Sequence, residues 1–145
     1  MIKKLLDKIS SVTEEEQKIV LIDPAALGGG RPEPDLRTIG MFCDVTEDKV
    51  AEIIHAMLYL NEVNKLEKNP ENKSPIDFYI STYGGSADDM FALYDIMRSI
   101  RQESEIHTLG LGKVMSAGVL LLAGGTKGKR RIAKNCRVMI HSVAA

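Results

Sequence analysis

The stretch PIDFYISTYGGSADDMFALYDIMRSI, residues 75–100, changes its hydrophobic period half-way along, and this change decides the fold class. Apolar residues at alternate positions, Ile76, Phe78 and Ile80, predict a strand over residues 75–81. The sequence TYGGS at 82–86 predicts a tight turn. Beyond it the spacing becomes helical, with an expected buried face of Met90, Leu93, Tyr94, Met97 and Ile100. A strand followed at once by a helix is typical of α/β proteins.

The polar residues at the two ends of this helix fit its polarity. Ser86, with Asp89 three residues later, predicts a capping box at the start of the helix. Asp88 and Asp89 lie at the positive end of the helix dipole, and Arg98 and Arg101 near its negative end. We therefore expect capping and dipole roles, and no catalytic role, for the two aspartates.

The same alternation of strands and helices extends in both directions. Upstream, residues 37–45 predict a strand and residues 64–74 a polar loop, and Thr46 predicts the N-cap of a helix between them. The expected stripe of that helix is Val50, Ile53, Ile54, Met57, Leu58 and Asn61. Downstream, residues 105–112 predict a strand, and RIA (131–133) and CRVMIH (136–141) predict two short ones. The order predicts an α/β domain with sheet layers faced by helices.

The first 36 residues differ from the rest in composition. Residues 1–18 predict an amphipathic helix with Leu5, Leu6 and Ile9 on one side, and KIVLI (18–22) predicts a strand. DPAALGGGRPEPD (23–35) is rich in glycine and proline and predicts a linker. We therefore divide the chain into an N-terminal segment with linker, 1–36, and one folded domain, 37–145.

Composition limits the class of protein. Of the 145 residues 44% are apolar, which is enough for a core, and a net charge of −1 disfavours a dedicated nucleic-acid binder. The basic turn GTKGKRR (125–131), with Lys127, Lys129, Arg130 and Arg131, is interpreted as a solvated hairpin.

Location follows from the apolar runs and the cysteines. The longest apolar run, 114–123, is about half of a membrane span, and Asp7 and Lys8 interrupt any signal-peptide core. Cys43 and Cys136 form no disulfide framework and are predicted to be buried free thiols, which favours a reducing compartment. These features predict a soluble, cytoplasmic protein.

One hydroxyl, Ser116, lies inside the apolar, glycine-rich run GKVMSAGVLLLAGG (112–125). A serine nucleophile needs a base and donors for the oxyanion that forms on attack. Three features of the sequence are candidates for the base and the oxyanion donors. His141 ends an apolar strand, the N–H of Ala117 would open a helix, and Gly84 with Gly85 exposes backbone at the end of another strand.

Each of these features also has a structural interpretation. Taken alone, Ser116 is more typical of close packing, and a strand-end histidine of a structural or solvated position. Gly84–Gly85 alone predicts only a turn. The G-x-S-x-G nucleophile elbow is not present, because residue 114 is Val. His55 lies off the helical stripe and is expected at the surface, and the three histidines are too far apart to predict a metal or other cofactor.

Three segments carry a resemblance to a known family. They are AEIIHAMLYLNEV (51–63), YISTYGGSADDMFALYDIMRSI (79–100) and GLGKVMSAGVLLLAGGTKGKRRIAKNCRVMIH (110–141). From about residue 38 to 141 the chain resembles ClpP, the proteolytic subunit of the ATP-dependent Clp protease. The resemblance implies a ClpP/crotonase-like α/β fold, a repeated ββα superhelix.

The resemblance also implies an activity. It predicts a serine endopeptidase that cleaves unfolded polypeptides, with Ser116 as nucleophile and His141 as general base. Gly85 and Ala117 would supply the oxyanion hole, and Gly84 with Gly85 would hold the substrate as an added strand. Members of the family form two stacked seven-membered rings and receive substrate from an AAA+ unfoldase of the ClpX or ClpA kind.

The chain departs from the family at several points. No carboxylate follows His141, so the expected catalytic aspartate, the handle helix and the C-terminal part have no counterpart in residues 142–145. Tyr83 stands where the family usually has proline, Ser142 and Val143 where it has Gln-Pro, and the first 36 residues match no axial-loop segment. The chain is thus interpreted as C-terminally truncated, for example from a compact genome such as a phage's, or as split.

Two other functions remain as alternatives. The first is a catalytically inactive or split structural subunit that needs a partner chain for the missing aspartate and handle. The second is a related enzyme acting on acyl-CoA thioesters, which Ser116 and His141 argue against because such enzymes need neither.

Overall fold

The computed structural model describes residues 35–142 of the 145-residue chain. The chain divides into two compact units, Met1–Leu36 and Arg37–Ala145, and the elements below belong to the second. The helix predicted over 1–18 and the strand over 18–22 lie outside the described residues, as does the predicted linker except for its last residue.

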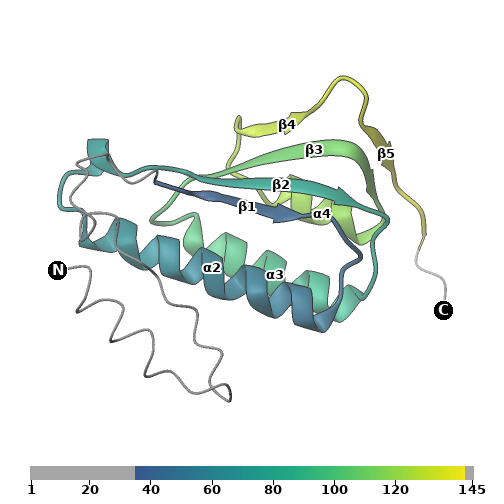
Figure 1. The fold of residues 1–145 in the computed structure, drawn as a ribbon, viewed down its shortest axis with the longest axis horizontal. Helices are drawn as coiled ribbons and strands as arrows, with labels where there is room; N and C mark the ends of the chain where they lie inside the picture. Colours follow the sequence, from purple (N-terminus) through teal and green to yellow (C-terminus); the bar gives the residue numbers. More distant parts are fainter. Residues whose placement is uncertain (1–34, 143–145) are drawn as a thin grey trace, which may run out of the picture. The chain divides into compact units, whose positions relative to one another are not determined.

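A parallel sheet forms the centre of the described unit (Figure 1). Its strands are β1 (Thr38–Met41), β2 (Ile76–Thr82), β3 (Ile106–Met115), β4 (Arg130–Ile132) and β5 (Arg137–Met139). The order is β1-β2-β3-β4, with β5 paired to β3 further along the same edge, and every pairing is parallel. Because the strands are parallel, their carboxyl ends point to the same end of the sheet.

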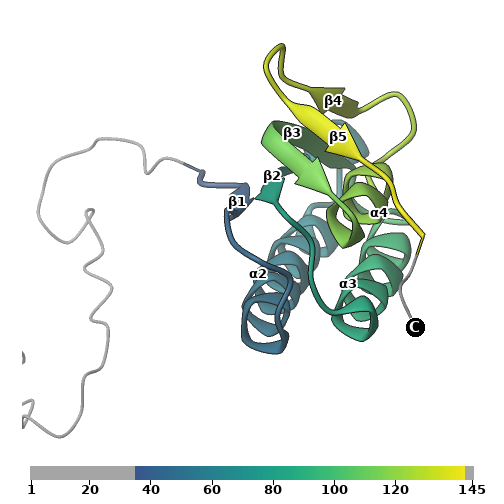
Figure 2. The same ribbon diagram turned by 90° about the vertical axis from the view of Figure 1, so that its right-hand side faces the viewer.

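Helices provide the long connections that parallel strands require. They are α2 (Glu47–Leu66), α3 (Ala87–Ile100) and α4 (Ala117–Ala123), with a short 3-10 turn, η2 (Pro70–Asn72), after α2. Figures 1 and 2 show all three helices on one side of the sheet, and α4 contacts β2, β3 and α3. This arrangement confirms the predicted α/β fold.

The core lies between the sheet and these helices. The predicted alternation in β2 is confirmed, because Ile76, Phe78 and Ile80 are all 0% exposed. From α3, Met90, Leu93, Met97 and Ile100 are buried, while Tyr94 is half-buried. Burying each large side chain of this kind stabilises the fold by about 1.5–3 kcal/mol.

The stripe predicted for the helix after Thr46 was partly wrong. Leu58 is exposed and Ile54 only half-buried, whereas Leu60 and Asn64 are buried instead. From Met57 the buried stripe continues to Leu60 and Asn61, three and four residues further along the helix, and it leaves out Leu58. Thr46 is the N-cap as predicted, but its side chain makes no capping hydrogen bond.

The strand predicted over 37–45 is shorter than expected. Regular pairing with β2 ends at Met41, and the chain touches the sheet again at Val45, which forms a single parallel bridge with Gly85. Val45 is 1% exposed, so this return is part of the core.

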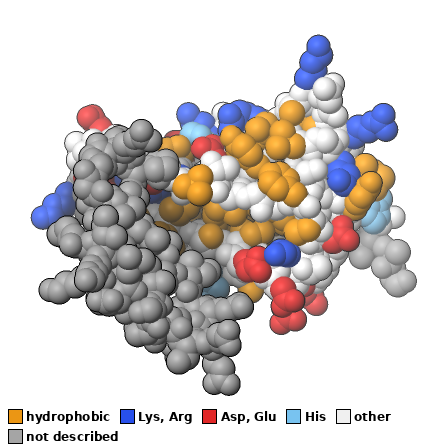
Figure 3. All heavy atoms as spheres, viewed as in Figure 1, with side chains coloured by type: hydrophobic (Ala, Val, Ile, Leu, Met, Phe, Trp, Pro, Cys, Tyr) orange, Lys and Arg blue, Asp and Glu red, His pale blue; other side chains and the backbone are white. Residues whose placement is uncertain are grey.

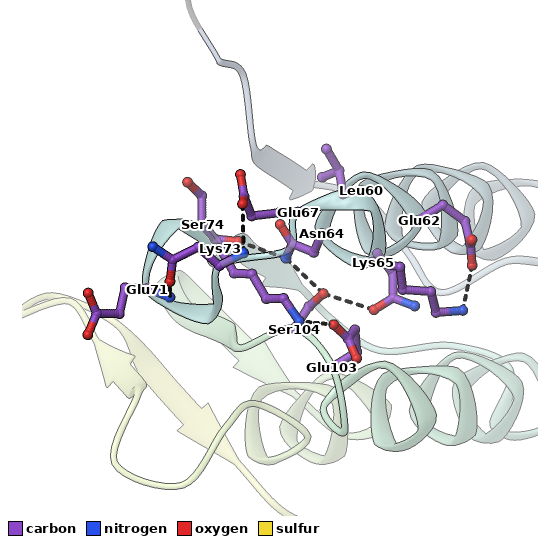
Figure 4. Close-up of polar contacts among 12 residues, drawn as sticks. Leu60, Glu62, Asn64, Lys65, Glu67, Glu71, Lys73, Ser74, Glu103 and Ser104 are labelled. Carbon is purple, nitrogen blue, oxygen red and sulfur yellow. Dashed lines mark hydrogen bonds and ion pairs between the residues drawn. The ribbon is translucent and has the colours of Figure 1, made fainter.

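A buried polar network fastens the end of α2 to the loop before β3 (Figure 4). The Asn64 side chain donates to the Ser74 carbonyl at 3.0 Å and to Ser104 Oγ at 2.8 Å, and it accepts from Arg37 at 2.9 Å. Ser104 in turn donates to Asn61 Oδ1 at 2.8 Å. Each donated or accepted bond offsets the desolvation of a buried polar group.

The two cysteines are less buried than the sequence predicts. Cys43 and Cys136 are free, but they are half-buried and not fully buried, since each packs at the margin of the core. Burial raises the pKa of the Cys136 thiol. Several large apolar side chains are exposed, among them Phe42 and Ile140. Figure 3 shows apolar patches on the face that it draws. Within residues 35–142 no helix is long and apolar enough to cross a membrane.

Candidate active site

Ser116 occupies the turn between β3 and α4. Its φ of 52° lies in the left-handed region, and no other non-glycine residue within 35–142 has a positive φ. Such a conformation costs on the order of 1–3 kcal/mol and persists where surrounding contacts enforce it. The Ser116 N–H donates to the Met139 carbonyl at 2.9 Å, which ties the turn to β5.

His141 reaches Ser116 because of the register between β3 and β5. Lys113 pairs with Arg137 and Met115 with Met139, so the residues that follow both strands emerge side by side. The His141 Nε2 lies 2.8 Å from Ser116 Oγ, within hydrogen-bonding distance. His141 is exposed, so the imidazole is open to solvent on its other side.

The Gly84–Gly85 turn packs directly on Ser116. Gly84 has a φ of 106°, and a Cβ at this position would lie 2.7 Å from Ser116 Cβ and 3.2 Å from the Ala117 nitrogen. Gly85 has a φ of 152°, and a Cβ there would lie 2.3 Å from the Val45 carbonyl oxygen. Both positions therefore require glycine, for backbone conformation and for space.

The backbone N–H groups of Gly85 and Ala117 lie beside Ser116. Each is oriented by a hydrogen bond that the carbonyl of the same peptide unit accepts. The Gly84 carbonyl accepts from Val45 N–H at 2.8 Å, and the Ser116 carbonyl accepts from Val119 N–H at 3.0 Å. In a trans peptide the C=O and N–H point in opposite directions, so these bonds direct the N–H groups of Gly85 and Ala117 away from Val45 and Val119. Neither N–H has an acceptor among the described residues.

A mostly apolar pocket of about 410 Å³ adjoins these groups. Ala87 and Met90 of α3 and Leu120 of α4 form its apolar wall, together with Ile140. Ser116 and His141 also line it, as do Gly85 and Ala117. The pocket has room for an apolar side chain beside the hydroxyl of Ser116.

No carboxylate contacts His141 within residues 35–142. Asp88 and Asp89 lie in the first turn of α3, where the Asp89 N–H donates to Ser86 Oγ at 3.3 Å, so one half of the predicted capping box is confirmed. The other half is wrong, because the Ser86 N–H donates to the Val45 carbonyl at 2.9 Å and not to the Asp89 side chain. The basic residues of the 125–131 segment, Lys127, Lys129, Arg130 and Arg131, are exposed, as predicted. The segment is not a hairpin, however, because it joins α4 to β4, which pairs with β3 in parallel.

Tyr83 leaves the pocket open. Its side chain is 66% exposed, and the Lys113 ammonium lies 4.5 Å from its ring centre. Tyr83 is not among the residues that line the pocket. Of the other departures from the family, Ser142 is exposed and Val143 lies outside the described residues.

Some residues that contribute to the site were not predicted from the sequence. Val45 forms hydrogen bonds with the glycine turn although it lies 40 positions before Gly85 in the chain, and no local sequence motif predicts this contact. The pocket-lining roles of Ala87 and Leu120 were also missed, although the apolar spacing of both helices was visible.

The fold and the site define a class: a parallel-sheet α/β protein with a serine–histidine pair at the carboxyl edge of the sheet. The model of the Clp protease family matches residues 35–145, and because this is more than half of the chain, the chain belongs to that family. Among solved structures, it is similar to the crystal structure of the ClpP protease catalytic domain from Plasmodium falciparum, with 34% identity and a TM-score of 0.64. The match covers 74% of this chain and 55% of that one, so the chain spans little more than half of its relative's length.

Proposed function

We propose that this chain is a serine peptidase subunit of the Clp type, with Ser116 as nucleophile and His141 as general base. The observation that carries the proposal is the 2.8 Å distance between Ser116 Oγ and His141 Nε2. A distance of this size permits direct proton transfer as the hydroxyl attacks a carbonyl.

The proposed reaction is acyl transfer. Ser116 Oγ attacks the scissile carbonyl and its proton passes to His141 Nε2 while the N–H groups of Gly85 and Ala117 bind the oxyanion. His141 then gives the proton to the leaving amine, and an acyl-enzyme remains on Ser116. Water, deprotonated by His141, hydrolyses that ester and restores the serine.

The substrate is proposed to be an unfolded polypeptide held in part by backbone contacts along Gly84 and Gly85. The apolar wall supports a preference for an apolar side chain next to the scissile bond. Membership of the Clp protease family supports further proposals: assembly into a ring, delivery of substrate by an AAA+ unfoldase and a cytoplasmic location. The two free thiols are consistent with the last.

A second candidate function has one observation in its favour. Within residues 35–142 no carboxylate orients the His141 imidazole. In serine proteases, loss of that carboxylate lowers kcat about ten-thousand-fold. The rival proposal is therefore a structural or split subunit that turns over substrate only when another polypeptide supplies the carboxylate and the handle.

A fluorophosphonate probe distinguishes the two, because it reports one nucleophilic attack and needs no turnover. We expect slow labelling of the folded chain at Ser116 that is lost in Ser116→Ala and strongly reduced in His141→Gln. His55→Gln serves as the matched control, since His55 is an exposed histidine on α2. A folded chain that stays unlabelled over hours would favour the structural subunit.

A separate experiment tests whether a substrate side chain binds in the pocket beside Ser116. Ala87 lines the pocket at the start of α3, so Ala87→Leu should narrow it and shift cleavage or probe preference toward smaller side chains. Ala92→Leu on the exposed side of the same helix is the control and should change nothing. Equal behaviour of the two variants would contradict the proposed binding of a side chain there.

A further inference from the structure

The two N–H groups proposed to bind the oxyanion belong to different elements. Gly85 follows β2, and Ala117 begins α4 after β3. Catalysis by both requires that the glycine turn and the first turn of α4 keep a fixed separation, since a shift of a fraction of an ångström weakens a hydrogen bond to the transition state. A side chain that contacts both turns would hold them at that separation.

Thr82, the last residue of β2, lies between them. It is 1% exposed, and its Oγ1 accepts a hydrogen bond from the Gly84 N–H at 3.0 Å. Its methyl group faces α4, because a Cβ added at Gly118 would lie 2.4 Å from Thr82 Cγ2. One buried side chain therefore contacts the glycine turn through its hydroxyl and the helix through its methyl.

The hydroxyl contact completes a clamp on Gly84. The N–H of Gly84 is held by Thr82 and its carbonyl by the Val45 N–H. Gly84 is the residue with a φ of 106°, and glycine rotates easily about such angles. Because the peptide units on both sides of Gly84 are fixed, the Gly85 N–H can point in only one direction, toward the space beside Ser116.

We propose that Thr82 is a positioning residue for the oxyanion hole, which it sets mainly through its hydroxyl, by accepting the Gly84 N–H, while the packing of its methyl group against Gly118 contributes less. The inference rests on the proposed function, because it assumes that Gly85 and Ala117 bind the oxyanion. Thr82 is 1% exposed and does not line the pocket beside Ser116. Its hydroxyl should therefore affect the stabilisation of the transition state more than the binding of the ground state.

Two substitutions separate the hydroxyl from the methyl. Thr82→Val keeps the shape of the side chain and removes the acceptor, which leaves the Gly84 N–H unpaired in a buried place. Thr82→Ser keeps the acceptor and removes the methyl. A merely structural role would make the two variants lose activity in step with their loss of folded protein.

The first readout is kinetic, in the full chain with a peptide substrate and a peptide aldehyde that forms a tetrahedral adduct. We expect Thr82→Val to lower kcat and aldehyde affinity together, by about ten- to a hundred-fold, with KM little changed. Thr82→Ser should restore most of kcat. An unchanged kcat in Thr82→Val, or an equal fall in both variants at equal folded fraction, would overturn the proposal.

The second readout needs no activity. Hydrogen exchange of the Gly84 amide, followed by ¹⁵N NMR, should be faster in Thr82→Val by about tenfold or more, and close to wild type in Thr82→Ser. Failure of Ser116 to label while these exchange rates behave as expected would refute the peptidase and leave the Thr82 contact standing. Unchanged Gly84 exchange in Thr82→Val refutes the positioning role whatever the activity.

Discussion

Replacing Ser116 with glycine should stabilise the protein relative to replacing it with alanine. Ser116 has a φ of 52° at the boundary of a strand and a helix. Ser116→Gly and Ser116→Ala both remove the hydroxyl and its contact with His141, so they differ only in the Cβ. Ser116→Ala retains the conformational strain, whereas glycine adopts this backbone without it.

The size of the difference follows from two opposing terms. The strain of a non-glycine residue in this region is about 1–3 kcal/mol. Glycine loses about 0.5–1 kcal/mol more chain entropy on folding than alanine. The net preference is about 1 kcal/mol for Ser116→Gly, which for a domain of this size corresponds to roughly 4 °C in Tm.

The assay is urea unfolding followed by far-UV circular dichroism, with thermal unfolding as a second measure. The control is Ala92→Gly, on the exposed side of α3, where the same exchange of alanine for glycine should cost about 1 kcal/mol. The exchange of alanine for glycine should therefore raise the stability of the protein at position 116 and lower it at position 92. If Ser116→Gly is no more stable than Ser116→Ala, the backbone at Ser116 is not strained as described.

Three further predictions concern other parts of the fold. Gly85→Ala should abolish Ser116 labelling and lower Tm, because its Cβ would overlap backbone at 2.3 Å; retained labelling would contradict this. Asn64→Ala should lower the free energy of unfolding by about 3 kcal/mol, since it leaves buried partners unpaired, whereas removing the exposed ion pair in Glu62→Ala should cost under about 0.5 kcal/mol. A similar loss in both would refute the role of the buried network. The hydrogen bond from His107 lowers the pKa of Glu105 below its ordinary 4.5, so this carboxylate stabilises the fold above pH 4.5, and the contribution is lost as the pH falls through the lowered folded-state pKa. Glu105→Gln should therefore unfold slightly more easily near pH 6, with the difference vanishing in acid; a difference that grows in acid would show the wrong sign.

Much of the architecture could be predicted because its signals are local. The alternation in residues 76–80 and the helical spacing in 90–100 each arise within a few turns of chain, so the structure confirms both. The shift of the α2 stripe from Leu58 to Leu60 shows the limit of this reasoning. In a 20-residue helix, small errors in phase accumulate, and the face that packs is decided by the sheet beneath it.

The parallel topology explains why the residues of the candidate site lie together. The glycine turn comes after β2, Ser116 after β3 and His141 after β5. Strands that all run in one direction place the residues beyond their carboxyl ends at one edge of the sheet. The sequence analysis grouped these residues by the chemistry that a serine nucleophile needs and by the family resemblance, and it did not predict the strand directions that bring them to one edge.

The contacts that give the site its geometry could not be predicted in the same way. Gly84 and Gly85 are interpretable from sequence as a turn, but the need for glycine comes from Ser116 and Val45, which lie far away in the chain. Thr82 is indistinguishable in sequence from any buried strand threonine, and its hydroxyl gains meaning only from the Gly84 N–H beside it. Local patterns predict where the chain turns. The direction in which a backbone N–H points after the turn depends on which distant group holds the carbonyl of the same peptide, and for Gly85 that group is the Val45 N–H.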